Sequence, residues 1–372
     1  MWKTLKTCLI IERSNKSNLY SLLFVAIIIV GLMFVASDEN FGNPLVDATT
    51  EYQSLSSAMS KFQVVDVNAI DNIDTTFGLL TRTRQAVSLK SAGLKIENEE
   101  LLNKASLRVI DYRDALYETA DFDLVKDLVK PKVHNDNERV FINALIEREV
   151  IQKQEPLQYW QFILSIFTII GIAWFPFLSF YTSGIMIEDF RHTTILKGYP
   201  VRFDQYVIAK SITKLFMIFS FIVLIFIISL PLIQFKGVGV ANYPVIVYND
   251  SPTAYTIPQY LLLCIGIMFV ITIFTLLLSI IFNMIFKNLY ITLFIQMILY
   301  FLPILFPSLI STLPYNPFNF LNFNMIIEGD TLGLTNPVDV TFIDGFITLS
   351  ICIVIMLIIV QRFLSTGKLK RA

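Results

Sequence analysis

Six apolar stretches dominate this sequence, and each is about as long as the part of an α-helix that crosses a membrane. The six stretches cover residues 19–37, 158–182, 212–233, 259–282, 289–311 and 342–363. A helix of about 20 apolar residues spans the hydrocarbon core of a bilayer. Only 16% of the 372 residues are charged, whereas soluble domains contain about 25%. We therefore predict an all-α integral membrane protein with six transmembrane helices.

Residues 1–18, before the first apolar stretch, predict a short amphipathic helix. Trp2, Leu5, Leu9 and Ile10 recur at helical spacing, and the basic residues lie elsewhere on the same helix. Such a helix lies in the headgroup layer of a membrane and is attracted by anionic lipids. The alternative interpretation is a solvated tail.

The first apolar stretch is interpreted as a retained transmembrane helix. It ends in the small residues Val35-Ala36-Ser37, which would also suit the cleavage site of a signal peptide. Its apolar run and the leader before it are both longer than is usual for a signal peptide, which favours retention.

Residues 38–157 form a polar insertion between the first and second apolar stretches. Residues 38–156 contain 21 Asp or Glu against 14 Lys or Arg. Apolar residues such as Leu45, Tyr52 and Leu55 recur with a helical period, whereas strand-like alternation is weak. We predict a helical domain of three to five helices. The alternative is a spacer with no binding role.

The distribution of basic residues predicts the orientation in the membrane. Fourteen Lys or Arg residues lie in one set of segments, residues 1–18, 183–214, 283–288 and 361–372. The short segments on the opposite side, 234–258 and 314–341, contain Lys236 alone. Because Lys and Arg are concentrated in cytoplasmic loops, both termini, including the tail 364–372, are predicted to be cytoplasmic. The chain is then a multi-pass plasma-membrane protein with residues 38–157 outside the cell.

Motifs for nucleotide binding and hydrolysis are missing from this sequence. Its Gly367-Lys368 pair is followed by Leu369, so it does not complete a P-loop, and no zinc-protease or nucleophile-elbow motif occurs. Three scattered cysteines and two distant histidines offer neither a disulfide framework nor a metal site. We predict no catalytic, cofactor or metal site in this chain and no nucleic-acid partner.

The apolar stretches also lack the charged residues that an ion-coupled carrier needs. Gln161 and Gln296 are their notable polar interruptions. Ionisable residues inside a membrane mark ion paths and proton relays. A transporter built from these helices would therefore take its energy from a partner protein.

The segment Ser183–Ser211 is a charged island between two apolar stretches. Its run Glu188–Val201 reads EDFRHTTILKGYPV. It resembles the cytoplasmic loop between the second and third spans of type-2 ABC exporter permeases, which has an acidic pair, a basic residue, a short helix and a Gly-Tyr-Pro-like break. The basic amphipathic start of the chain and Pro314–Phe318 are also similar to that family. His192 and Thr193 depart from its common Asn-Gly-Thr-like run, and residues 38–156 are not covered.

The resemblance implies that residues 183–211 dock a separate ABC ATPase, which would bind ATP and magnesium. The residues expected at this docking element are Ile187, Glu188, Asp189, Phe190, Arg191, His192, Ile195, Gly198 and Tyr199. The apolar members would enter a cleft on the ATPase, and the charged members would form ion pairs at its rim, which set register and specificity. The alternative is an ordinary cytoplasmic loop that carries charges and a turn.

The proline-rich exit of the fifth stretch suggests a gate on the outer side. The gate candidates are Pro303, Pro307, Pro314, Tyr315 and Phe318. Prolines would break the helix, and residues 312–341 would form a re-entrant piece that is tolerated at membrane depth where protein covers it. The alternative is an ordinary interfacial loop.

Together these observations predict the permease subunit of an ABC exporter that moves an amphipathic or hydrophobic substrate, such as a peptide or a lipid-like molecule. Its partners would be the ATPase, a second identical or homologous permease chain and the lipid bilayer. The alternative is a membrane sensor or immunity protein that binds a ligand through its extracellular helical domain. A lipid-modifying enzyme is disfavoured because the sequence offers no recognisable nucleophile or acid–base pair.

Overall fold

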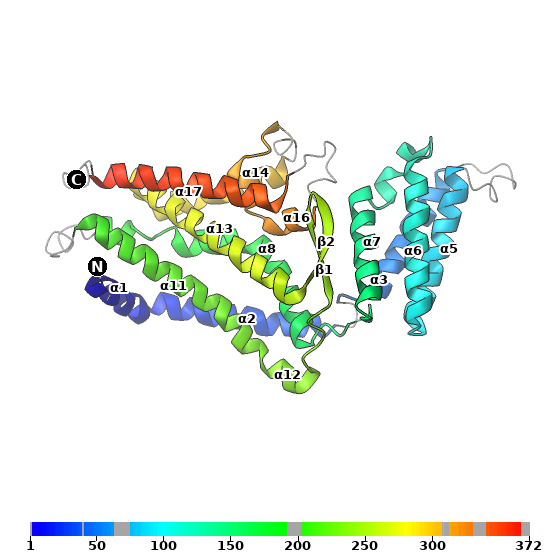
Figure 1. Cartoon of the computed structure of the whole chain (residues 1–372). Coiled ribbons are helices and arrows are strands. Elements are labelled where there is room, and N and C mark those ends of the chain that lie inside the picture. The colour runs from blue at the N-terminus through cyan, green and yellow to red at the C-terminus, as the bar shows by residue number, and fades with distance from the viewer. Residues whose placement is uncertain are drawn as a thin grey trace.

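A computed structural model describes residues 2–38, 41–62, 75–152, 154–191, 202–306, 308, 312–329 and 340–365. It consists of an elongated helical bundle with a smaller helical domain at one end (Figure 1). The first helix of the described chain and the C-terminal end of its last helix both lie at the other end of the bundle. We call that end the terminal end and the opposite one the domain end.

The bundle contains five helices that are long and apolar enough to cross a membrane. They are α2 (Lys16–Ala36), α8 (Tyr159–Thr182), α11 (Phe203–Ser229), α13 (Ile257–Phe286) and α17 (Phe342–Ser365). A shorter apolar helix, α14 (Leu289–Leu305), has 17 residues, or about 26 Å against a hydrocarbon core of about 30 Å. The expected multi-pass helical membrane architecture agrees with these elements, and α14 ends before the predicted boundary at residue 311.

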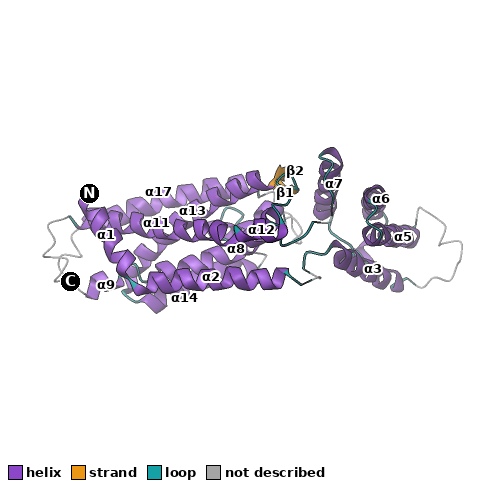
Figure 2. Cartoon of the chain, turned by 90° about the horizontal axis from the view of Figure 1, so that it is seen from below, coloured by secondary structure: helices purple, strands orange, loops and turns teal. Residues whose placement is uncertain are grey.

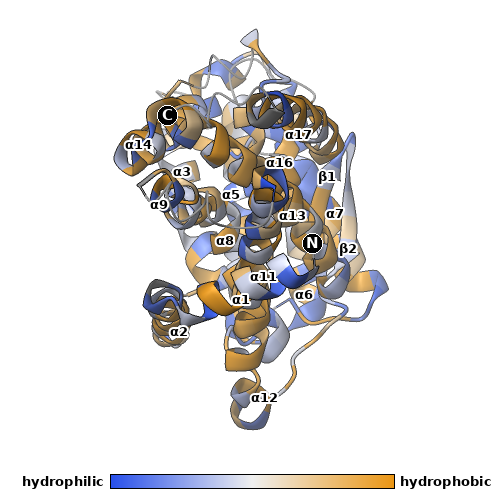
Figure 3. Ribbon diagram, turned by 90° about the vertical axis from the view of Figure 1, so that its left-hand side faces the viewer, coloured by the Kyte–Doolittle hydropathy of each residue, from blue (hydrophilic) through white to orange (hydrophobic). Residues whose placement is uncertain are grey.

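Helix α13 forms the centre of the bundle. In its most apolar stretch 67% of the residues are buried, against 11% in α2 and 17% in α17. It packs against α8, α14 and α17, and the bundle is coloured largely hydrophobic when viewed from the terminal end (Figure 3). Apolar side chains on an outer surface are expected where lipid replaces water as the solvent.

Two short helices lie at the terminal end, α1 (Trp2–Ser14) and α9 (Ile187–Arg191) (Figure 2). Helix α1 packs along α11. Its buried face consists of Thr4, Cys8 and Glu12, at successive helical turns, whereas Trp2 and Ile10 are exposed. The predicted N-terminal helix is therefore present. Helix α11 begins at Phe203, within the segment that was expected to be a loop up to residue 211.

The helical domain contains four α-helices within the described residues, which lies inside the predicted range of three to five. They are α3 (Pro44–Ser60), α5 (Thr76–Lys95), α6 (Glu99–Tyr117) and α7 (Lys132–Glu147), with 3-10 turns η1 (Phe122–Leu124) and η2 (Lys126–Leu128). Three of the helices start at a side-chain cap supplied by Asn43, Thr75 or Asn98, which satisfies a backbone N–H that the helix leaves free. Leu80, Val87 and other apolar residues fill the core between them.

A two-stranded β-hairpin, which an all-α fold class does not include, follows the short helix α12 (Pro231–Lys236). Strand β1 (Pro244–Asn249) pairs antiparallel with β2 (Ser251–Thr256), and Asp250 forms the turn with a φ of 58°. Alternating β-branched and aromatic residues flank an Asn-Asp turn here, which is the pattern of a hairpin. The sequence interpretation treated residues 234–258 only as a short segment between two spans, so it missed a signal that was present.

The hairpin connects the helical domain to the bundle. Helix α7 packs on both strands. The Arg148 guanidinium, just after α7, donates hydrogen bonds to the backbone oxygens of Asn242 at 3.0 Å and Ala254 at 2.7 Å. Asn137 on α7 also donates to the backbone oxygen of Glu328 at 2.9 Å. The two bodies therefore meet through a specific polar contact rather than through a free linker alone.

Candidate functional site

A group of paired polar side chains joins α1, α2, α8, α9 and α11 at the terminal end. This terminal-end cluster consists of Glu12, Asn18, Tyr181, Asp189, Tyr206, Lys210 and Lys214. Asp189 accepts from Lys210 Nζ at 2.7 Å and from the Tyr206 hydroxyl at 2.9 Å. Lys214 Nζ lies 2.9 Å from the Glu12 carboxylate. The four charged side chains are at most 13% exposed, so each ion needs its partner.

The cluster depends on one face of α11. Tyr206, Lys210 and Lys214 lie at successive turns of this helix and therefore point to the same side. Lys214 Nζ is 4.7 Å from the centre of the Tyr181 ring, a distance at which a cation is attracted to an aromatic face. The Tyr181 hydroxyl in turn donates to Asn18 at 2.9 Å. The cluster thus ties α1, α8 and α9 directly to α11, and α2 through Tyr181.

The structure places the first part of the expected docking element on α9. Glu188 is exposed, whereas Ile187 and Asp189 are buried, and Phe190 is partly buried against the core of the bundle. Asp189 pairs with Lys210 inside the chain, so its carboxylate does not lie at the outward rim that the sequence suggested. Arg191 ends the helix. The remaining expected residues, His192, Ile195, Gly198 and Tyr199, lie outside the described residues.

The segment after α14 folds back into the domain end of the bundle. It forms a 3-10 turn, η3 (Pro317–Phe320), and a short helix, α16 (Phe323–Glu328). We call residues 317–328 the domain-end plug. Phe320, Phe323 and Ile327 within it are buried. Two glycines permit this fit, because a Cβ on Gly171 would lie 2.7 Å from Asn324 Cβ and one on Gly345 would lie 2.4 Å from Phe320.

The expected gate residues lie around this plug. Pro303 is buried within α14, and Phe318 contacts Phe274 of α13 edge-on with ring centres 6.1 Å apart. Pro314 and Tyr315 precede the plug, and the Tyr315 side chain is exposed. Pro307 lies outside the described residues. The geometry brings Pro303 and Phe318 into the bundle and leaves Tyr315 at its surface.

Neutral polar side chains connect α8, α13 and α14 inside the bundle. Ser279 on α13 bonds to the Thr182 hydroxyl at 2.7 Å and accepts from Gln296 Nε2 at 2.8 Å. Asn283 donates to the backbone oxygen of Ser183 at 2.8 Å. All five residues are buried. Such interhelical bonds hold helices together in lipid without the cost of a buried charge. We call this group the neutral seam.

The helical domain contains a buried ion network of a different kind. Arg113 is 1% exposed and pairs with Glu51 and with Glu138, the latter at 2.7 Å. Lys90 and Lys130 also contact Glu138. Burial alone would raise the pKa of Glu138, but the charges of Lys90, Arg113 and Lys130 and a hydrogen bond from Arg113 outweigh it and hold this pKa well below its usual range. The Glu138 carboxylate is therefore ionised at neutral pH, and the network holds α3, α5, α6 and α7 together.

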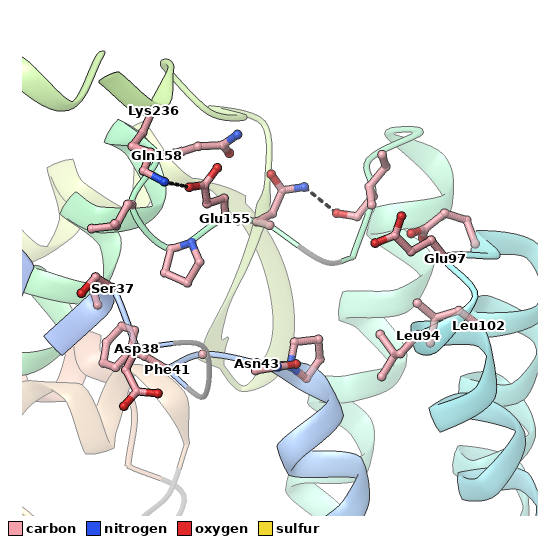
Figure 4. Close-up of a pocket in the computed structure, with 18 of the residues that line it drawn as sticks. Ser37, Asp38, Phe41, Asn43, Leu94, Glu97, Leu102, Glu155, Gln158 and Lys236 are labelled. Atoms are coloured by element: carbon pink, nitrogen blue, oxygen red, sulfur yellow. Dashed lines mark hydrogen bonds and ion pairs between the residues drawn. The ribbon is translucent and has the colours of Figure 1, made fainter. Parts of the chain in front are cut away.

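A cavity of about 640 Å³ lies where the helical domain joins the bundle (Figure 4). We call it the neck cavity. Its walls come from the end of α2, the segment leading into α3, the turn between α5 and α6, and the segment before α8. Lys236 of α12 also lines it and lies 2.6 Å from the Glu155 carboxylate. Sequence reasoning could not find this cavity, because its walls come together only in the fold.

Metal and disulfide sites were not expected from the sequence. Within the described parts of the chain, no group of three or more His, Cys, Asp or Glu side chains could hold a metal ion. Cys8, Cys264 and Cys352 are each free thiols. The polar groups described above are therefore the chemistry on which a functional assignment can draw.

No family model, curated protein or solved structure matches this chain. The assignment of a function therefore rests on the geometry of the chain itself.

Proposed function

We propose that this chain is the membrane subunit of an ATP-driven exporter of the ABC type, to which a separate ATPase docks at the terminal end. The sequence contains no P-loop of its own, so the ATPase, with its ATP and magnesium, would be a partner protein. By analogy with two-fold exporters, a second permease chain, identical or homologous, would complete the path across the bilayer.

The observation that carries this proposal is the attachment of α9 to α11. Helix α9 presents Glu188 outward, and the adjacent Asp189 is bound to Lys210 and Tyr206 on α11. A force applied to α9 would therefore reach a membrane-spanning helix directly through a buried ion pair. An ATPase needs such an element, because a soluble motor can move a membrane helix only through a rigid contact outside the bilayer.

Helix α14 is proposed as the sixth membrane crossing. Helix α1 and the C-terminal end of α17 both lie at the terminal end of the bundle (Figure 1). This arrangement requires an even number of crossings between them, whereas five of the described helices are long enough to span. A bilayer can become thinner around a short span at modest cost. The concentration of Lys and Arg at the terminal end favours the cytoplasm for this end and the outside of the cell for the helical domain.

An amphipathic or hydrophobic substrate, such as a peptide or a lipid-like molecule, fits this membrane part best. The neutral seam offers hydroxyl and amide groups rather than charges between α8, α13 and α14. A path for ions or for strongly hydrated solutes would need charged groups or a series of oxygen ligands. The domain-end plug, packed between α8, α13 and α17, would close the outer end of the path in this conformation.

The proposal is tested by co-purification of the full chain, in mild detergent from its native membrane, with assays for ATP hydrolysis and for P-loop proteins. We expect a P-loop ATPase and its activity in the eluate of the unaltered chain. The double substitution Glu188→Lys and Phe190→Ala should reduce the amount of bound ATPase at least about tenfold, the ratio expected when a contact energy of about 1.4 kcal/mol is lost.

The substitution Glu147→Lys provides a matched control, because Glu147 is also an exposed acidic residue but lies on α7 in the helical domain. It should leave the bound ATPase unchanged. Membrane insertion of all variants is checked by fractionation. An unaltered chain that brings down no ATPase activity, or equal loss in both variants, would contradict docking at α9.

The neck cavity favours a second candidate, a membrane sensor or immunity protein. In that case the helical domain and the bundle would bind a ligand between them, and the spans would carry a signal rather than a substrate. A ligand that binds the neck cavity and leaves ATP hydrolysis by the purified complex unchanged would favour this candidate over the exporter.

A further inference from the structure

The domain-end plug contains a short helix that depends on contacts from outside itself. Helix α16 has six residues, and its last residue, Glu328, is followed by Gly329 in the left-handed conformation with a φ of 76°. A helix of this length is marginal in isolation, and its last backbone carbonyls have no partner within the helix. Neighbours that supply such partners therefore decide whether α16 keeps its place.

Helix α7 of the helical domain supplies one of these partners. The side-chain nitrogen of Asn137 donates to the Glu328 backbone oxygen at 2.9 Å, so the domain caps the C-terminal end of α16. This helix lies at the end of the bundle that faces α7 (Figure 1). On α7, Asn137 is flanked by Asn135 and Glu138, both of which bind Arg113 in the core of the domain. The cap therefore moves with the domain as a whole.

The hairpin holds the plug from a second direction. Helix α16 packs on β1, and a Cβ added to Gly329 would lie 2.9 Å from Tyr248 Cγ. Position 329 therefore combines a φ that favours glycine with a close approach that a side chain would prevent. Arg148, at the end of α7, donates to the Ala254 backbone oxygen of the same hairpin at 2.7 Å. Both contacts thus come from elements that belong to the helical domain or are bound to it.

A buried thiol lies on the inner side of the plug. The Tyr260 hydroxyl of α13 donates to the Asn324 side-chain oxygen at 3.3 Å, and Asn324 donates to the Glu328 carboxylate at 3.0 Å. Cys264 follows Tyr260 by one helical turn and interacts with it, so both side chains lie on one face of α13. Cys264 is a free thiol and is buried. A displacement of the plug would uncover this face, so the reactivity of Cys264 reports the movement.

From these contacts we infer that the helical domain holds the domain-end plug in place, and that a tilt of α7 away from the bundle releases it. The tilt breaks the cap at Glu328, the plug leaves Tyr260, and water reaches the face of α13 that carries Cys264. In an exporter this release would open the outer end of the path. The inference goes beyond the proposed function, because the release itself requires neither an ATPase nor a substrate and applies equally to a sensor.

The reaction of Cys264 with a membrane-impermeant maleimide tests this inference in the full chain, reconstituted in phosphatidylcholine nanodiscs. The substitutions Cys8→Ser and Cys352→Ser leave Cys264 as the one thiol of the chain, and intact-mass spectrometry measures its rate of modification. Asn137→Leu removes the cap and keeps the size of the side chain. We expect this variant to react about two- to tenfold faster than the chain with Asn137, the range expected for the loss of one hydrogen bond.

Two further variants locate the effect. Gly329→Ala should also raise the rate at Cys264, because the added methyl group would push the plug away from Tyr248. Asn103→Leu is the matched control and should leave the rate unchanged. Asn103 and Asn137 are both partly buried asparagines of the helical domain whose side-chain oxygens have no partner among the described residues. Asn103 lies on α6, however, whereas the cap of α16 comes from α7.

A second reporter separates release of the plug from a general loosening of the chain. Cys8 is buried at the terminal end, so a chain that keeps only Cys8 should react at the same rate with and without Asn137→Leu. An unchanged rate at Cys264 in Asn137→Leu would overturn the inference, and so would an equal increase in Asn103→Leu or at Cys8. Since the assay contains no ATPase, a failure of docking at α9 would not affect its outcome.

Discussion

The helical domain and the bundle bury polar side chains in two different ways. In the domain, Arg113 lies among Glu51 and Glu138 as part of an ion network. In the bundle, the neutral seam joins three helices through hydroxyl and amide groups, such as those of Ser279 and Gln296. The ion network pairs its charged groups, whereas the seam leaves the side-chain oxygens of Asn283 and Gln296 buried without a partner among the described residues.

The difference follows from what surrounds each body. A charged side chain in the domain moves on folding from water into a protein interior that supplies several counter-ions. A buried carboxylate such as that of Glu138 therefore stays ionised. A charge on a helix of the bundle would be inserted into a membrane, at a cost of about 2.5–3.5 kcal/mol at the centre of the bilayer. The ion pairs Asp189–Lys210 and Glu12–Lys214 lie at the terminal end, where α1 and α9 meet α11. The neutral seam begins beside them, because its Thr182 directly follows Tyr181 of the terminal-end cluster.

The largest effect is expected from Arg113→Ala in the helical domain. Removing this guanidinium leaves two buried carboxylates without their main counter-ion, which costs about 3–5 kcal/mol for a buried pair. Hydrogen exchange should show a matching loss of protection in residues 44–60 and 76–147 and no change in α13. Arg108→Ala on the same helix is the control, because Arg108 is exposed. Equal effects of the two substitutions would show that the network does not stabilise the domain.

A smaller effect is expected from acid, again confined to the domain. The pKa of Glu138 in the folded domain lies well below its usual range, so between that pKa and the unfolded value of about 4.3 the unfolded chain binds more protons. The stability contributed by Glu138 is therefore complete at a pH above its pKa in the unfolded chain. This stability is lost as the pH falls through its pKa in the folded domain. Hydrogen exchange at stepwise lower pH should show this loss.

The variant Glu138→Gln is the control for the acid experiment. It lacks the carboxylate, so the opening free energy of its domain should fall less steeply with decreasing pH than that of the unaltered chain. The neutral seam contains no group that titrates in this range, and the protection of α13 should stay constant. A steep loss of hydrogen-exchange protection in α13 with decreasing pH would contradict the proposed difference between the charged network of the domain and the neutral seam of the bundle.

The smallest effect is expected from Gln296→Met in the neutral seam. The substitution removes the donor to Ser279, and interhelical hydrogen bonds in membranes contribute about 0.6 kcal/mol on average and up to about 1.7 kcal/mol. The coupling energy is measured by reversible unfolding in mixed micelles, with a double-mutant cycle that includes Ser279→Ala. A coupling energy between Gln296 and Ser279 as large as the loss of stability in Arg113→Ala would contradict the distinction, because the seam would then stabilise the bundle as strongly as the ion network stabilises the domain.

The sequence predicts the elements of this protein better than their contacts. Long apolar runs predict spans because a bilayer fixes the length that a helix must have, and the helical period around Leu55 predicts the domain in the same way. The pairing of Arg113 with Glu51 could not be predicted, because residues far apart in the chain meet only after the helices pack. The same limit applies to the neck cavity and to the burial of the domain-end plug.

Some of the candidate site did carry a local signal. The spacing of Tyr206, Lys210 and Lys214 indicates one polar face on α11, which an interpretation of residues 183–211 as a loop overlooked. An Asn-Asp turn between β-branched residues likewise indicates the hairpin. In both cases the assignment of a whole segment to a loop hid a regular pattern within it.

The hairpin has a mechanical consequence. Strand β2 ends at Thr256 and α13 begins at Ile257, and the Thr256 backbone N–H is bound to the Gln259 side chain at 2.9 Å. No hinge therefore separates the hairpin from the central helix of the bundle. Arg148 joins the end of α7 to the same hairpin, so a tilt of the helical domain would rotate α13 with it. A change of conformation at the junction of the domain and the bundle would then reach the centre of the bundle without passing through the peripheral helices.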